Sequence, residues 1–278
     1  MPDLAAPNNL LDWFALVTLG IAIGAFGTLI GAGGGFVLVP LLLFLYPRQT
    51  PAQLTAVSLA VVFVNACSGS VSYYRLRRAD YRSGFLLAIA TIPGAVVGAI
   101  LVGAVPRGVF EAIMGSALLL VGALLAIRPK GRLPLLGGFP GSVERTIVDS
   151  EGRVHHYRFN LALAMIASIA VGFLSSILGI GGGIIHVPVL TTFFDFPEHI
   201  ATATSHFVLI FTSGAGAGTH LFQGNYGSTI GLTVALAIGV LSGAPLGAAL
   251  SRRVTGTWII RLLAVALGMV GLRLLVAA

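Results

Sequence analysis

The chain contains the stretch Gly31-Ala32-Gly33-Gly34-Gly35-Phe36-Val37-Leu38-Val39-Pro40, which returns as Gly179-Ile180-Gly181-Gly182-Gly183-Ile184-Ile185-His186-Val187-Pro188. Both copies lie between apolar runs. Because each glycine costs a helix about 1 kcal/mol relative to alanine, three in a row predict a break. The apolar run from Gly34 to Tyr46 would be about 18 Å long as a helix, against about 30 Å of hydrocarbon in a bilayer. We therefore expect each copy to open a half-helix inside a membrane, with a positive N-terminus that favours an anion.

The composition excludes most classes of soluble protein. Of 278 residues, 56% are hydrophobic and only 9% are charged, which predicts a multi-pass membrane protein surrounded by lipid. The net charge of +7 argues against nucleic-acid binding because of where the basic residues lie. Twelve of the sixteen fall in three loops, as expected of cytoplasmic loops in the cell (cytoplasmic or inner) membrane: Arg75, Arg77, Arg78, Arg82, Arg128, Lys130, Arg132, Arg145, Arg153, Arg158, Arg252 and Arg253.

The second half of the chain repeats the first. Gly31 returns at Gly179, Thr55 at Thr202 and Gly94 at Gly243, at offsets of 148, 147 and 149 residues. We predict an all-α polytopic membrane protein with two repeats of about five membrane segments, each containing a glycine-broken half-helix. Residues 1–127 would form the first membrane repeat, 128–158 a cytoplasmic loop and 159–278 the second membrane repeat. An odd number of crossings per repeat keeps the basic loops on one side, so the two repeats are expected to be inverted.

The loop over residues 128–158 is the only sizeable polar region of the sequence. Two short β-prone runs, 145–148 and 153–157, flank Asp149-Ser150-Glu151-Gly152, which is typical of a β-hairpin. His155 and His156 are adjacent, and neighbours on a strand point to opposite faces, so they do not predict a metal site. The single cysteine, Cys67, allows no disulfide. We expect neither a metal nor a cofactor.

The doubled motif is the basis of a family resemblance. G-x-G-G-G, with four residues between its last glycine and a proline, occurs twice, and Thr-Ala-x-Ser follows each copy at 55–58 and 202–205. Over nearly the whole chain this resembles the sulfite exporter TauE/SafE family of membrane transporters. The resemblance implies export or passage of sulfur-containing anions such as sulfite or organosulfonates. It indicates the fold more firmly than the substrate, because one fold serves many ligands.

The first candidates for anion contact are the backbone amides of the two glycine triplets, Gly33, Gly34, Gly35, Gly181, Gly182 and Gly183. Convergent N–H groups suit sulfonate oxygens, and glycine lets the backbone approach a ligand closely. The alternative is that these glycines only let helices pack. We favour ligand binding for the triplets, since packing does not need three glycines in a row. For isolated pairs such as Gly94 with Gly98 and Gly243 with Gly247 we favour packing.

Six side chains complete the candidate site. Ser58 and Ser205 occupy matching places, and Asn65 and Thr212 follow them two helical turns later on the same face. Each could donate to an anion, or instead bond its own helix or a neighbouring one. His186 and His206 are ionisable groups inside membrane segments, where such groups face a cavity or a partner. A protonated histidine would attract an anion or couple transport to protons, and a neutral one would bond a neighbouring helix.

Three functions fit these residues to different degrees. A transporter, acting as an exporter, would bind a sulfur oxyanion or organosulfonate near the midplane between the two half-helix N-termini. An anion channel or facilitator with a glycine-lined constriction would use the same residues. An intramembrane metalloenzyme built on His186, His206 and His220 would lack both H-E-x-x-H and a carboxylate in the middle of a segment. We favour the transporter over any enzyme, and leave open the anion, the flux direction, the coupling ion and the oligomeric state, a homodimer included.

Overall fold

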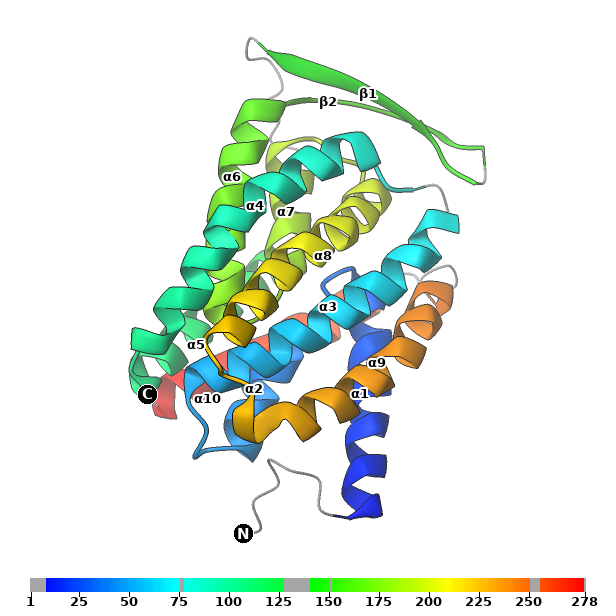
Figure 1. Ribbon diagram of the computed structural model, residues 1–278. Coiled ribbons are helices and arrows are strands. Elements are labelled where there is room, and N and C mark those ends of the chain that lie inside the picture. Colours follow the sequence, from blue (N-terminus) through cyan, green and yellow to red (C-terminus); the bar gives the residue numbers. More distant parts are fainter. Residues whose placement is uncertain (1–8, 76–77, 128–140, 151, 251–255, 278) are drawn as a thin grey trace.

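The structure is a computed structural model that describes residues 9–75, 78–127, 141–150, 152–250 and 256–277. Figure 1 shows a bundle of helices with one β-hairpin lying across its upper end. Residues 128–140 of the expected loop, and Arg252 and Arg253, lie outside the described part. The elements are α1 (Leu10–Ile30), α2 (Gly35–Leu45), α3 (Pro51–Arg75), α4 (Tyr81–Leu101), η1 (Val102–Ala104), α5 (Arg107–Ile127), β1 (Ser142–Val148), β2 (Val154–Asn160), α6 (Leu161–Leu178), α7 (Gly183–Phe193), α8 (Glu198–Phe222), η2 (Gly227–Thr229), α9 (Ile230–Leu250) and α10 (Gly256–Ala277).

Within the described residues, six helices are long and apolar enough to cross a membrane: α1, α3, α4, α6, α8 and α9. Each offers at least 18 residues of high mean hydropathy, close to the length that spans a hydrocarbon core. In contrast, α2 and α7 are apolar but only 11 residues long. The chain is therefore a multi-pass helical membrane protein, as its composition predicts.

The helix contacts of the two halves correspond to each other. α1 packs along α9 and α6 packs along α4, while α9 also contacts α3 and α4 also contacts α8. Two further extensive contacts join matching helices, α3 with α8 and α5 with α10. Figure 1 shows α3 and α8 side by side in the middle of the bundle. Residues carried on these two helices are therefore placed at the centre of the fold.

Isolated glycines bring neighbouring helices into backbone contact. A Cβ at Gly94 or Gly98 on α4 would collide with main-chain atoms of α6, at Ile169 and Phe173. On α9, Gly243 and Gly247 face main-chain atoms of α1 in the same way. These two pairs act in packing, as small residues do where membrane helices approach closely.

The β-hairpin is attached to both α6 and the connection between α7 and α8. β1 and β2 are antiparallel, with Ser142 opposite Asn160 and Val148 opposite Val154. Tyr157 and Phe159 of β2 pack on Phe196, with ring centroids 4.5 and 4.8 Å away. The Asn160 side chain accepts a hydrogen bond from the Leu163 amide at 3.0 Å and so caps α6. The polar segment therefore has its own small apolar contact with the bundle.

A buried carboxylate fastens the hairpin to the first half of the chain. Asp80 caps α4 by accepting a hydrogen bond from the Ser83 amide at 3.0 Å, and it also accepts a hydrogen bond from the Tyr157 hydroxyl at 2.7 Å. The Arg145 guanidinium lies 3.5 Å from the same carboxylate. Burial, followed by the Asp80 charge, raises the pKa of Tyr157, so its phenol keeps its proton.

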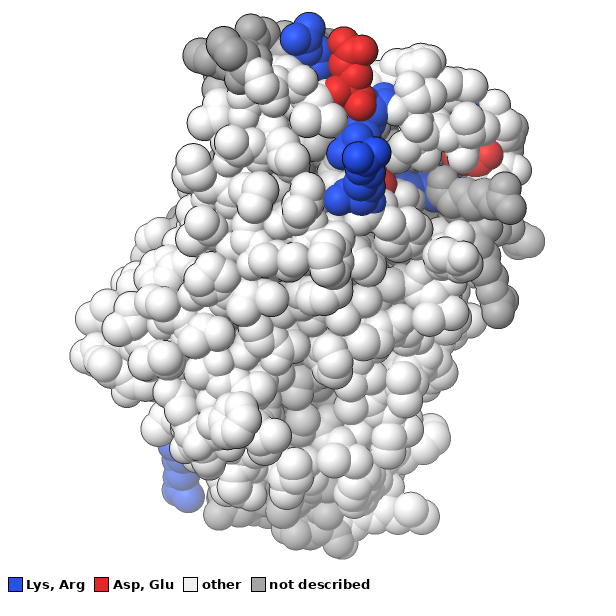
Figure 2. All heavy atoms as spheres, turned by 45° about the horizontal axis from the view of Figure 1, so that its top comes forward, with Lys and Arg blue, Asp and Glu red and all other residues white. Residues whose placement is uncertain are grey.

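Charged side chains gather at the hairpin end. A second carboxylate, Asp149, lies 3.0 Å from Arg153, 3.4 Å from His155 and 3.9 Å from Arg78. Figure 2 shows basic and acidic residues concentrated at this end, above a body that is almost free of charge on the face in view. Such a separation is typical of a protein whose body lies in lipid and whose charged end lies in water.

We expect Tyr157→Phe to destabilise the protein by about 1–3 kcal/mol near neutral pH, because buried Asp80 loses a donor. The raised pKa means that the folded state holds the phenol proton more tightly than the unfolded state. Its stabilisation is therefore complete below the ordinary tyrosine pKa of 10.0 and is lost as pH rises above it. Thermal unfolding in detergent from neutral to alkaline pH should show a lower Tm and a shallower alkaline decline. Exposed Tyr74→Phe is the control, and wild-type behaviour of both variants would contradict this role.

Candidate functional site

The two glycine turns have the same backbone conformation. After α1 ends at Ile30, Gly31, Gly33 and Gly34 adopt φ values of 78°, 76° and 88°. After α6 ends at Leu178, the corresponding glycines, Gly179, Gly181 and Gly182, adopt 69°, 81° and 95°. Residues with a Cβ rarely occupy this left-handed region, so glycine is required at these places by the backbone itself. The glycines are therefore explained by a four-residue turn, at residues 31–34 and again at 179–182, which connects the end of one helix to the start of the next.

The two turns contact each other directly through their main chains. A Cβ at Gly35, the first residue of α2, would lie 2.8 Å from the Ile180 carbonyl oxygen. A Cβ at Gly183, the first residue of α7, would lie 2.6 Å from the Gly31 carbonyl oxygen and 2.7 Å from Ala32 Cα. The beginnings of α2 and α7, 148 residues apart in the sequence, thus lie together at one place.

The central helices α3 and α8 surround this contact with matching residues. Val62 of α3 and Leu209 of α8 both lie against Gly33 and against Gly181. The backbone contact between the turns is therefore enclosed by one apolar side chain from each half. Both side chains are almost completely buried.

The first turns of α2 and α7 hold backbone donors without partners in the described chain. The Gly34 carbonyl accepts from the amides of Val37 and Leu38, and the Gly182 carbonyl accepts from those of Ile185 and His186. The preceding amides, those of Gly34 to Phe36 and Gly182 to Ile184, donate to no described residue. Unpaired N–H groups and the positive end of the helix dipole make such positions attractive to anions.

Four of the six predicted side chains have partners in the protein, namely His186 and the three side chains of Ser58, Asn65 and Thr212. Ser58 donates to the Gly179 carbonyl at 2.6 Å, so it braces the second turn from α3. Asn65 donates to the Gly33 carbonyl at 3.1 Å and braces the first turn. Thr212, its counterpart on α8, bonds Thr91 of α4 at 2.8 Å instead. In the structure these three side chains bond protein groups, and two of them hold the turns in place.

Other polar side chains at the turns are buried and unpartnered. Within the described residues, neither Ser205 Oγ nor either ring nitrogen of His206 has a hydrogen-bond partner, and both side chains are fully buried. The same holds for Ser175 and Ser176 at the end of α6, where Ser175 Oγ would lie 2.9 Å from a Cβ at Gly182. Our sequence analysis missed these two serines. The signal was available, because they stand immediately before the second glycine motif.

The other two buried histidines of the described bundle, His186 and His220, are bonded. His186, three residues after Gly183, has Nε2 3.2 Å from Ser168 Oγ. His220 lies between Thr55 Oγ1 at 3.4 Å and Asn225 Nδ2 at 2.9 Å. Among the residues that the structure describes, no three His, Cys, Asp or Glu side chains come together.

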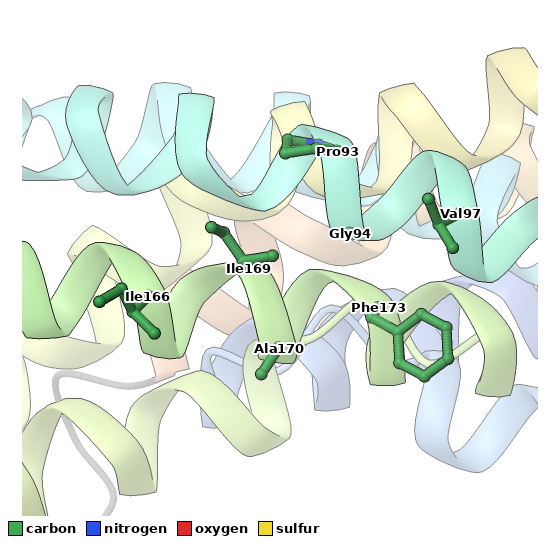
Figure 3. Close-up of a pocket in the computed structure, with 7 residues that line it drawn as sticks. All are labelled: Pro93, Gly94, Val97, Ile166, Ile169, Ala170 and Phe173. Carbon is green, nitrogen blue, oxygen red and sulfur yellow. The ribbon is translucent and has the colours of Figure 1, made fainter.

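A separate groove lies on the outside of the bundle. It has a volume of about 420 Å³ and is lined by α4 and α6. Figure 3 shows its apolar lining, with Pro93 and Val97 opposite Ile169 and Phe173. With no polar group to replace the hydration of an anion, this groove is not a candidate for the anion site.

We expect Gly183→Ala to destabilise the protein by about 1–3 kcal/mol, since a new Cβ would overpack the backbone of the opposite turn. Gly218→Ala is the matched control, because a Cβ at this position on α8 meets nothing within 4 Å. It should leave stability unchanged or raise it by up to about 1 kcal/mol through better helix propensity. Thermal unfolding of the two purified variants measures the difference, and equal Tm values would show that the turns are not in tight contact.

Comparisons with known proteins agree with the membrane architecture. A family model described as Sulfite exporter TauE/SafE matches residues 16–274. The chain is 31% identical to Probable membrane transporter protein YunE of Bacillus subtilis (strain 168), over 95% of this chain and 98% of the relative. It is 22% identical to Probable membrane transporter protein MJ0441 of Methanocaldococcus jannaschii, over 94% of each. It is 28% identical to Probable membrane transporter protein ORF9 of Sinorhizobium sp, over 89% of this chain and 84% of the relative. No solved structure matches it significantly.

Proposed function

The chain belongs to the sulfite exporter TauE/SafE family, and from this premise we propose that it exports small sulfur-containing anions, such as sulfite or organosulfonates, across the cell membrane. Membership of this family and the similarity to membrane transporters support transport rather than catalysis. The choice of anion rests on the description of the family together with the chemistry of the glycine turns.

The observation that carries the proposal is the set of unpartnered polar groups at the two turns. On α6 and α8, the helices that adjoin the turns, four fully buried side chains lack side-chain partners among the described residues: Ser175, Ser176, Ser205 and His206. Ser175 lies against Gly182, and the amides of Gly182 and of the next two residues donate to no described residue. Leaving buried polar groups unpaired costs about 1–3 kcal/mol each, so their grouping is best explained by a ligand that pairs them. Donors are in excess, which suits the oxygens of an anion.

The two short helices are proposed to approach this site from opposite faces of the membrane. The far end of α7 leads to Phe196, which packs on the β-hairpin. The far end of α2 is held elsewhere, because Arg107 at the start of α5 donates to the Leu43 carbonyl at 2.9 Å. Figure 1 shows α7 near the hairpin and α2 toward the opposite end of the bundle. This arrangement supports two inverted repeats with half-helix N-termini meeting near the midplane.

The basic hairpin end is proposed to face the cytoplasm. Arg78, Arg145 and Arg153 lie at this end, and positive loops favour the cytoplasmic side of a cell membrane. An exporter would then load its anion from the end to which α7 returns. The basic groups would raise the local concentration of anions there.

A carrier fits the packing better than an open channel. The main chains of the two turns touch, and Val62 and Leu209 lie against both. Seating an anion between the turns therefore requires the two halves to move apart, which is the expected step in alternating access. Counterflow in proteoliposomes distinguishes the two cases, because only a carrier accelerates tracer uptake when unlabelled anion is loaded on the opposite side.

Binding to the purified protein tests the function directly. Isothermal titration with sulfite, thiosulfate and methanesulfonate, with acetate as the comparison anion, should show binding of at least one sulfur anion in preference to acetate. Tracer flux of the anion that binds should then saturate with concentration. The absence of any sulfur-anion binding would overturn the proposed function.

We expect Ser176→Ala and Ser205→Ala to leave the Tm of the ligand-free protein unchanged or higher, since each removes an unsatisfied hydroxyl. Both should weaken sulfur-anion affinity about tenfold or more, because a hydrogen bond to a charged group contributes about 1.5–3 kcal/mol. Titration of each variant measures this. Thr18→Ala, which removes a hydroxyl bonded within α1 far from the turns, is the control and should bind like wild type. Unchanged affinity in both serine variants would remove these hydroxyls from the site.

A further inference from the structure

His206 differs from the other two buried histidines of the bundle, His186 and His220, because no side chain among the described residues is hydrogen-bonded to its ring. Its side chain is 0% exposed, no described side chain is hydrogen-bonded to either ring nitrogen, and the nearest polar groups are the backbones of Asn65 and Gly31. His186 and His220 are also well buried, but each is bonded to a neighbouring side chain. A histidine kept only for packing would be expected to have such a bond, because an unpaired buried polar group is costly.

The repeat shows that this place does not need a histidine for packing. Leu59 stands at the matching position of the first half, 147 residues earlier, and is also 0% exposed. Leu59 lies against Gly216 of α8, and His206 lies against Gly69 of α3. Gly69 and Gly216 are themselves 147 residues apart. The same local packing therefore accepts leucine on one side and imidazole on the other.

None of the described residues recorded against the His206 ring carries a negative charge. On α3, the Tyr73 ring packs edge-on at a centroid distance of 5.4 Å, and the Asn65 backbone is close by. On α1, the ring is near the Gly31 backbone and Thr28. Of the described residues recorded against the ring, Tyr73 is the only titratable one and none is charged. An imidazolium here would have no protein anion to pair with.

The ring nevertheless lies next to the first glycine turn. Tyr73 donates to the Thr28 carbonyl at 2.8 Å, Thr28 bonds Asn65, and Asn65 bonds Gly33 of the turn at 3.1 Å. A negative ligand at this turn would supply the missing counter-charge. Conversely, a buried cation without such a ligand is strongly disfavoured, so proton and anion each make the other's binding more favourable.

On the basis of the proposed anion site, we infer that His206 takes up a proton when the anion binds, so that one proton crosses the membrane with each anion. The proton attaches to a ring nitrogen from the side on which the site is open. It leaves to solvent, together with the anion, on the other side. For a monovalent anion the loaded site carries no net added charge, which lowers the cost of moving it through the low-dielectric bundle.

The test compares proton uptake in the wild-type chain and in His206→Leu, the residue that the repeat already accepts. Titrations of sulfite and of methanesulfonate into the detergent-purified protein are made in buffers of different ionisation enthalpy, from mildly acidic to alkaline pH. Wild type should take up one more proton per bound anion than the variant on the alkaline side. There its affinity should fall about tenfold per pH unit relative to that of His206→Leu. Subtracting the proton uptake of the variant from that of wild type removes the protons that the anion itself gains or loses on binding.

Two further variants keep the test decisive. His206→Gln can form hydrogen bonds but cannot titrate, and it should bind the anion without the extra proton, even if the leucine variant proves unstable. His220→Gln should keep the uptake seen in wild type. Equal proton uptake and equal pH dependence in wild type and His206→Gln would overturn the inference while leaving anion binding intact. Failure of wild type to bind either anion would instead overturn the proposed function.

Discussion

The structure depends on one contact, in which the main chains of two glycine turns touch at the starts of α2 and α7. Gly35 lies on the backbone of Ile180, and Gly183 lies on the backbone of Gly31 and Ala32. Any side chain at either glycine would separate the turns. Because these glycines have none, two helix N-termini reach the same place, where their unpaired amides and dipoles add. The central helices α3 and α8 then enclose this contact with matching residues of the two halves.

The two halves of the chain have matching helices and contacts, and the proposed anion site includes positions at which the halves differ. Val62 and Leu209 have equivalent places and equivalent contacts. Ser58 and Ser205 have equivalent places, yet Ser58 bonds Gly179 while Ser205 has no described partner. Leu59 and His206 differ in residue type at the same packing position. A duplicated scaffold can thus hold two turns together while presenting different polar groups to a ligand at each one.

Among the described residues, the charged side chains that are buried, Arg78, Asp80 and Asp149, all lie at the hairpin end. Asp80 and Asp149 bind their arginine partners at the hairpin end, outside the apolar body. At the turns, the described polar groups are hydroxyls, amides and imidazoles instead. Because a lone buried charge is costly, an interior of neutral donors can accept an anion without first breaking an ion pair. The packing of Phe196 on the hairpin links the charged end to α7.

Local sequence pattern was sufficient to predict the membrane class, the helix ends at Gly31 and Gly179, and the packing roles of Gly94 and Gly243. These features depend on hydropathy, φ preference and residue size, which act over a few neighbouring residues. The same pattern singled out Ser58, Asn65, Ser205 and His206, yet it could not tell which of them the protein itself would bond. It also missed Ser175 and Ser176, whose importance arises only from their position beside Gly182 and Gly216. Hydrogen-bond pairing inside the bundle depends on which helices meet. Such pairs are distant in the chain, 121 residues for Ser58 with Gly179, which is beyond the reach of any local rule. Only the tertiary structure therefore decides which polar groups have a protein partner.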